Sequence, residues 1–274
     1  CVMEQIILAI IIIALGFYVF KFYPFEKGNV MNLVIAAIFI ILTAICKRLA
    51  IMIPLFGAES LKIGFEYIPL MLAGYFLSPG YAFLVGLSSD IIGLILVPTG
   101  FPFLGFTLGT ILVSVIPSLA KEHAKMLSEK IVQSIVMGLI LVLGLGASIY
   151  IYTLDQVTIS TTVHIITSQE KLTLISVCLI LTIIFIILIF ILKKQISQDE
   201  AKEFSTWILC VTLVEIVVTL CLTPLWLDMM YGIPFFVSLC IRVIKECAIL
   251  PIEIFIGYTL IKLMKRIFVR LNKS

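Results

Sequence analysis

Eight ionisable residues lie within or at the ends of apolar runs, and they are the first candidates for chemistry: Lys47, Arg48, Asp90, Glu215, Arg242, Lys245, Glu246 and Glu253. A charge at the centre of a membrane-spanning helix costs about 2.5–3.5 kcal/mol on insertion scales. Such residues therefore normally face a protein interior or a water-filled cavity. Their presence predicts a polar site enclosed by helices.

Half of these residues belong to one apolar run near the C-terminus. Lys245 and Glu246 follow Arg242 by three and four residues, so the three share one helical face. Glu253 comes seven residues after Glu246 and extends this face. A guanidinium offers a planar fork to a carboxylate, and an ammonium adds a second positive charge. The pattern favours a lined cavity; the alternative is that Arg242 only neutralises Glu246, Asp90 or Glu215 within the protein.

An aromatic stretch, TPLWLDMMYGIPFF, precedes this run. Trp226 and Tyr231 are typical of residues that anchor a protein at the membrane interface. Beside an arginine, the same pair is also suited to stacking on a flat heterocycle. We expect an aromatic turn here, on the outer side.

The elements that must position these residues are membrane helices. Hydrophobic residues make up 62% of the chain, charged residues only 13%, and the mean hydropathy is +1.25. A soluble domain carries about 25% charged residues. The fold class is therefore an all-α integral membrane protein.

No metal or cofactor is expected. The cysteines lack CxxC spacing and mostly lie in apolar segments, and His123 and His164, the only histidines, fall in predicted loops. No HExxH, GxSxG or Walker motif is present, so we expect no enzyme activity.

Nine segments are long enough to cross or nearly cross a bilayer core, which takes about 20 helical residues. They are 4–21, 31–54, 64–78, 80–97, 103–120, 131–152, 171–193, 205–226 and 233–263. Lys and Arg gather in 121–130, 193–203 and the C-terminal tail. The positive-inside rule then predicts an external N-terminus and a cytoplasmic C-terminus.

Two runs of sequence resemble the substrate-binding S components of energy-coupling factor (ECF) vitamin transporters, most closely the folate type. The first is KIGFEYIPLMLAGYFLSPGYAFLVGLSSDIIGLILVPTGFPFLGFTLGTIL, and the second is TPLWLDMMYGIPFFVSLCIRVIKECAILPIEIFIGY. Together the similarity covers about 31–120 and 205–268. The matching positions are Pro69, Pro79, Gly86, Asp90, Trp226, Tyr231, Gly232 and Arg242.

The resemblance implies a six-helix core that captures a vitamin, with folate first, from outside the cell. It also implies a transmembrane coupling protein and two cytoplasmic ATPases as partners. Members of the family dock the coupling protein through small residues on the first core helix, which predicts a docking face at Ala36, Ala37 and Ala44. The expected ligand contacts are Arg242, Lys245, Trp226, Tyr231, Asp90 and Arg48.

The chain is longer than this core, which predicts four segments. These are an extra helix in 1–29, core helices in 30–120, an inserted helix pair in 121–203, and the last core helices with a basic tail in 204–274. Two alternatives stay open: the same scaffold serving riboflavin, pantothenate or thiamin, or a membrane-embedded enzyme using Asp90, Glu215 or the Glu246/Glu253 pair as acid–base groups.

Overall fold

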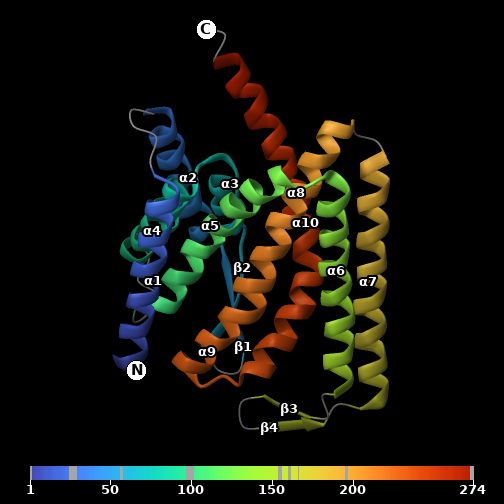
Figure 1. Cartoon of the computed structure of the whole chain (residues 1–274). Coiled ribbons are helices and arrows are strands. Elements are labelled where there is room, and N and C mark those ends of the chain that lie inside the picture. Colours follow the sequence, from blue (N-terminus) through green and yellow to red (C-terminus); the bar gives the residue numbers. More distant parts are fainter. Residues whose placement is uncertain are drawn as a thin grey trace.

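The structure is a computed structural model that describes residues 2–24, 30–55, 58–96, 102–153, 156–159, 162–165, 167–194 and 197–271. Helices dominate it, as the sequence predicts (Figure 1). They are α1 (Val2–Phe22), α2 (Val30–Arg48), α3 (Tyr67–Phe76), α4 (Pro79–Leu96), α5 (Leu104–Met126), α6 (Glu129–Thr153), α7 (Ser168–Lys194), α8 (Gln198–Val214), the π-helix η1 (Glu215–Leu222), α9 (Thr223–Tyr231) and α10 (Phe235–Leu271).

Within the described residues, seven helical stretches are long and apolar enough to cross a membrane. They are α1, α2, α4, α5, α6, α7 and a continuous stretch formed by α8, η1 and α9. The short helix α3 and the long, more polar α10 complete the bundle. The α-helical membrane class is confirmed, and every predicted span contains helix, although the span 31–54 runs past the end of α2.

Strands occur only as two hairpins among the described residues, and the sequence pattern predicted neither of them. β1 (Ile51–Leu55) pairs with β2 (Ala58–Ile63), and β3 (Gln156–Ile159) pairs with β4 (Thr162–Ile165), both antiparallel. The predicted second span, 31–54, was too long, because α2 ends at Arg48 and the chain then becomes extended. The β1–β2 register shifts between Ile53 and Leu55, beside Pro54, which cannot donate a ladder hydrogen bond.

The helix α5 is the centre of the packing. It contacts α3 and α4 on one side and α8, η1 and α9 on the other. Gly74 and Gly86 allow this close approach, since a Cβ on Gly86 would lie 2.6 Å from the Cα of Ile111. Trp207 is fully buried on α8 and links it to α10: its Nε1 donates a hydrogen bond of 3.0 Å to the carbonyl oxygen of Ile254.

Three helices lie at the edges of the bundle (Figure 1). α1 packs on α4 and α5, whereas α6 and α7 pack on each other and on α8 and α10. These are the helices that the sequence analysis set apart from a six-helix core. Most of their surface is apolar and exposed, which suits contact with lipid. The division of the chain into core and additions stays a prediction.

The predicted basic regions meet at one end of the bundle. Lys262 lies 3.2 Å from Glu200, and Lys265 lies 2.6 Å from Glu203. Part of the predicted basic loop 121–130 is helical instead, because α5 continues to Met126. The start of α1 and the end of α10 lie at opposite ends of the molecule (Figure 1). This arrangement agrees with an odd number of crossings, and the direction across the membrane stays a prediction.

Candidate ligand-binding pocket

A cavity of about 240 Å³ lies among α2, α3, α4, α5, η1, α9 and α10. Five of the six residues predicted to contact a ligand line this cavity: Asp90, Trp226, Tyr231, Arg242 and Lys245. Tyr231 is 48% exposed and therefore marks its rim. The sixth predicted contact, Arg48, is exposed and does not line the cavity; its neighbour Lys47 does. Helical geometry explains this difference, because adjacent residues on a helix point about 100° apart.

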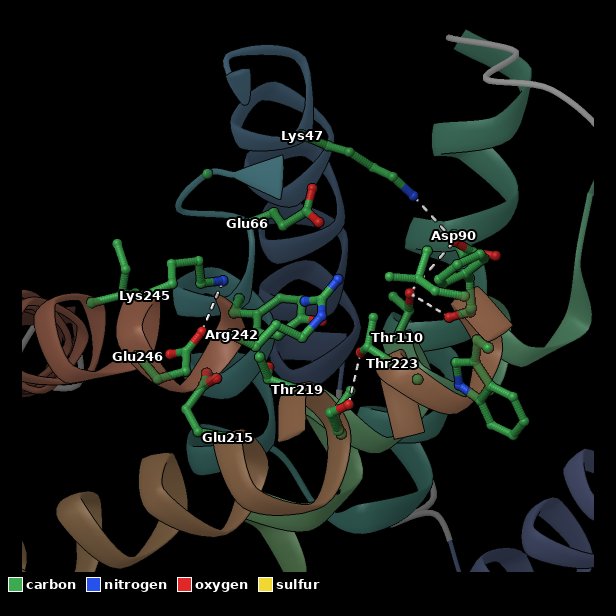
Figure 2. Close-up of a pocket in the computed structure, with 18 of the residues that line it drawn as sticks. Lys47, Glu66, Asp90, Thr110, Glu215, Thr219, Thr223, Arg242, Lys245 and Glu246 are labelled. Atoms are coloured by element: carbon green, nitrogen blue, oxygen red, sulfur yellow. Dashed lines mark hydrogen bonds and ion pairs between the residues drawn. The ribbon is translucent and has the colours of Figure 1, made fainter. Parts of the chain in front are cut away.

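One wall consists of the charged face of α10 together with η1. Arg242, Lys245, Glu246 and Glu253 all line the cavity, so the predicted shared face is confirmed. Lys245 Nζ lies 2.8 Å from Glu246 Oε1. Figure 2 shows both side chains beside Arg242 and Glu215. We call Glu215, Glu246 and Glu253, with these two cations, the carboxylate end of the pocket.

The irregular segment η1 sets the position of Glu215. A π-helix has a wider turn than an α-helix, and such segments are frequent at functional sites. Glu215 and Thr219 stand on its cavity side, and Thr223 follows at the start of α9. Thr223 donates from Oγ1 to the carbonyl oxygen of Val218 at 2.7 Å. Pro224, which has no N–H group, comes next and opens α9.

The opposite wall is organised by Asp90. Its carboxylate lies 3.1 Å from Lys47 Nζ and accepts a hydrogen bond of 2.7 Å from Thr107 Oγ1. Thr110 Oγ1 is 3.5 Å away, at the limit of a hydrogen bond. Figure 2 shows this network on the side of the pocket away from the carboxylate end. Asp90 therefore joins α2, α4 and α5 through Lys47 and Thr107, and its role as a ligand contact stays a prediction.

Aromatic side chains cover the same side. Phe103 and Trp226 meet edge to face with ring centroids 6.0 Å apart, and both line the cavity with Phe106. Trp226 is only 5% exposed, so it lies inside the protein and not in an interface belt. Its Nε1 has no hydrogen-bond partner among the described residues. The predicted aromatic turn is wrong in one respect: residues 223–231 are helical, and the turn comes at Gly232, whose φ is +66°.

Several pocket residues were not predicted from the sequence. Glu66 and Tyr67 enter the cavity from the start of α3, and Thr110, Thr219 and Thr223 add hydroxyl groups. Threonines carry no signal within an apolar run, since their hydroxyl groups usually bond to the preceding turn of their own helix. Among the described residues, no group of three or more acidic, histidine or cysteine side chains is arranged to hold a metal ion.

The three alanines of the predicted docking face do not share one environment. Ala36 is buried in the core of the chain, so it offers no surface to a partner in this structure. Ala37 is exposed and Ala44 is half-buried. A docking role for Ala37 and Ala44 stays a prediction.

Comparison with known proteins finds similarity to a curated protein and to a solved structure. The folate transporter FolT of Clostridium novyi (strain NT) is 36% identical over 92 residues, 33% of this chain. The chain matches about half (49%) of that relative's length. A crystal structure of FolT bound with folic acid shares 19% identity and a TM-score of 0.45, over 83% of this chain and 92% of that one. This score is too low to establish a common fold. No family model matches the chain.

Proposed function

We propose that this chain is the substrate-binding membrane subunit of an ECF-type transporter and that it captures folate. The observation that carries the proposal is a cavity inside a helical bundle whose lining combines charged residues with aromatic ones. The similarity to a folate transporter over 92 residues supports folate as the ligand. Riboflavin, pantothenate and thiamin are the alternatives on the same scaffold.

In this proposal the protein binds and delivers its ligand without chemical change. Arg242, only 7% exposed, contacts an acceptor group of the ligand, since a guanidinium always carries its donors. Trp226, Phe103 and Phe106 contact apolar and ring surfaces. The coupling protein and two ATPases are proposed partners that supply the energy, and the basic end of the bundle is proposed to face the cytoplasm.

Isothermal titration with folate in lipid nanodiscs tests the proposal. We expect wild-type protein to bind folate and Arg242→Ala to bind it about 10- to 150-fold more weakly, the equivalent of a hydrogen bond to a charged group worth about 1.5–3 kcal/mol. Arg266→Ala is the matched control, because Arg266 is exposed on the same helix outside the pocket. Equal affinities for wild type and Arg242→Ala would exclude the arginine contact.

Mass spectrometry of the ligand that co-purifies with the chain separates the candidate vitamins. Folate or a reduced folate supports the proposal. Recovery of riboflavin, pantothenate or thiamin, with no folate binding in the titration, would assign another vitamin to the same pocket.

A further inference from the structure

The carboxylate end of the pocket has more carboxyl oxygen atoms than hydrogen-bond partners for them. Glu215 and Glu253 are each 2% exposed and both line the cavity. Among the described residues, Oε1 of Glu215 and Oε2 of Glu253 have no hydrogen-bond partner. Glu215 and Glu253 hydrogen-bond each other, but a buried oxygen atom left without a partner is unfavourable in a protein interior, and still more so within a bilayer. These two atoms are therefore acceptor positions for a ligand.

The nearby cations do not change this conclusion. Lys245 is engaged by Glu246 at 2.8 Å, and Lys47 by Asp90 at 3.1 Å. Arg242 donates from Nε to Ser238 Oγ at 3.4 Å and also interacts with the surrounding acidic groups. The lining as a whole carries five carboxylic residues and three basic ones: Glu66, Asp90, Glu215, Glu246 and Glu253 against Lys47, Arg242 and Lys245. Carboxyl groups therefore outnumber basic groups in this lining.

Among the described residues, the far side of this wall offers Glu215 no free polar partner. Glu215 and Glu246 also border a second cavity of about 60 Å³ on the side of α6 and α7. Its other lining residues are apolar or glycine except for Thr182, whose hydroxyl group donates to the carbonyl oxygen of Cys178. The second cavity therefore supplies no donor for Glu215, and the main pocket is the side from which a ligand can reach it.

We propose that the carboxylate end binds the hydrogen-bonding edge of a neutral 2-amino-4-oxo heterocycle. Glu215 and Glu253 accept the ring N–H and the exocyclic amino group, and Arg242 donates to the neighbouring carbonyl oxygen. This inference rests on the proposed function and refines it, since the pterin ring of folate has this edge. The charged tail of folate then extends toward the rim near Tyr231, where it stays hydrated.

Two free heterocycles test the inference directly: pterin, which has the 2-amino group, and lumazine, which has a carbonyl group at that position. We measure the binding of each, and of folate, to the full chain in nanodiscs by titration. Wild-type protein should bind pterin at least about 100-fold more tightly than lumazine, because the lumazine carbonyl faces a carboxylate and leaves it unpaired.

Two substitutions test whether Glu215 and Glu253 produce the preference for pterin over lumazine. Glu215→Gln and Glu253→Gln each replace an acceptor oxygen with an amide that can also donate, so the pterin-to-lumazine preference should fall at least about tenfold. Glu122→Gln is the matched control, because the Glu122 side chain is 43% exposed on α5 and pairs with Lys125 outside the pocket. Thermal unfolding of each variant shows whether it is folded.

The outcomes separate this inference from the proposed function. Folate binding with equal affinities for pterin and lumazine overturns the inference and leaves the function standing, as does a preference unchanged in both glutamine variants. A pterin preference that depends on Glu215, without folate binding, supports the inference and rejects folate as the ligand. Failure to bind any of the three compounds overturns both.

Discussion

The substitution Gly86→Ala tests whether the contact between α4 and α5 positions the pocket. A Cβ at this position would lie 2.5 Å from Ser114 Oγ and 2.6 Å from the Cα of Ile111. Carbon atoms in favourable contact are about 3.5–4.0 Å apart, so the helices must separate by about 1 Å. Overpacking of this kind costs about 1–3 kcal/mol. Asp90 lies one turn further along α4, so the same shift weakens its 2.7 Å hydrogen bond from Thr107.

The assay compares Gly86→Ala with Gly138→Ala, a matched substitution on α6. A Cβ on Gly138 would have no heavy atom within 4 Å. Both variants gain the same preference of alanine for a helix, about 0.5–1 kcal/mol, so the difference between them isolates packing. We expect Gly86→Ala to be less stable than Gly138→Ala by about 1–3 kcal/mol in reversible unfolding in detergent. It should also bind folate more weakly.

Equal stabilities for the two variants would refute this account of the α4–α5 contact. Loss of stability with unchanged folate affinity would show instead that the contact supports the fold without positioning the pocket.

Two further predictions concern buried contacts. Asp90→Ala removes the partner of both Lys47 and Thr107, so it should lower the free energy of unfolding by about 1–3 kcal/mol. Asp90→Asn keeps an acceptor for the Thr107 hydrogen bond and should lower this free energy less; chemical unfolding of both variants checks the prediction. Gly257→Ala should destabilise the protein more than Gly146→Ala does. A Cβ on residue 257 would overlap the buried ring of Trp207, whereas a Cβ on residue 146 would meet no heavy atom within 4 Å. Equal melting temperatures for the two variants would contradict this.

Regular helices were the part of the fold that the sequence predicted well. Apolar runs such as those of α6 and α7 must form helices in a bilayer, since every backbone N–H and C=O must be hydrogen-bonded within the segment. The errors lie where this constraint weakens. The β1–β2 hairpin follows a run that stays apolar past Arg48, so hydropathy alone could not end the helix there.

Part of the candidate site could be predicted because it lies on a regular helix. Spacing on a continuous helix placed Arg242, Lys245, Glu246 and Glu253 on one face, and the structure agrees. Arg48 lies outside the pocket lining, because which residue of a helix end faces a cavity depends on the rotation of that end, which neither charge nor hydropathy determines; its ligand role stays a prediction. The π-helix η1 could not be predicted, since no local residue pattern in the run from Glu215 requires the wider turn.

The structure also changes which chemistry the charges predict. From the sequence, an arginine and a lysine on one helical face indicate a site for an anion, because each side chain carries a positive charge and such charges are rare within a membrane. The pairing of these charges in the structure is the basis for proposing a neutral ligand edge at the carboxylate end instead. Lys245 is paired with Glu246 within α10, and η1 brings Glu215 against the same wall. What the pocket offers there in excess is hydrogen-bond acceptors, and a ring edge that donates two hydrogen bonds and accepts one from Arg242 satisfies them without adding negative charge.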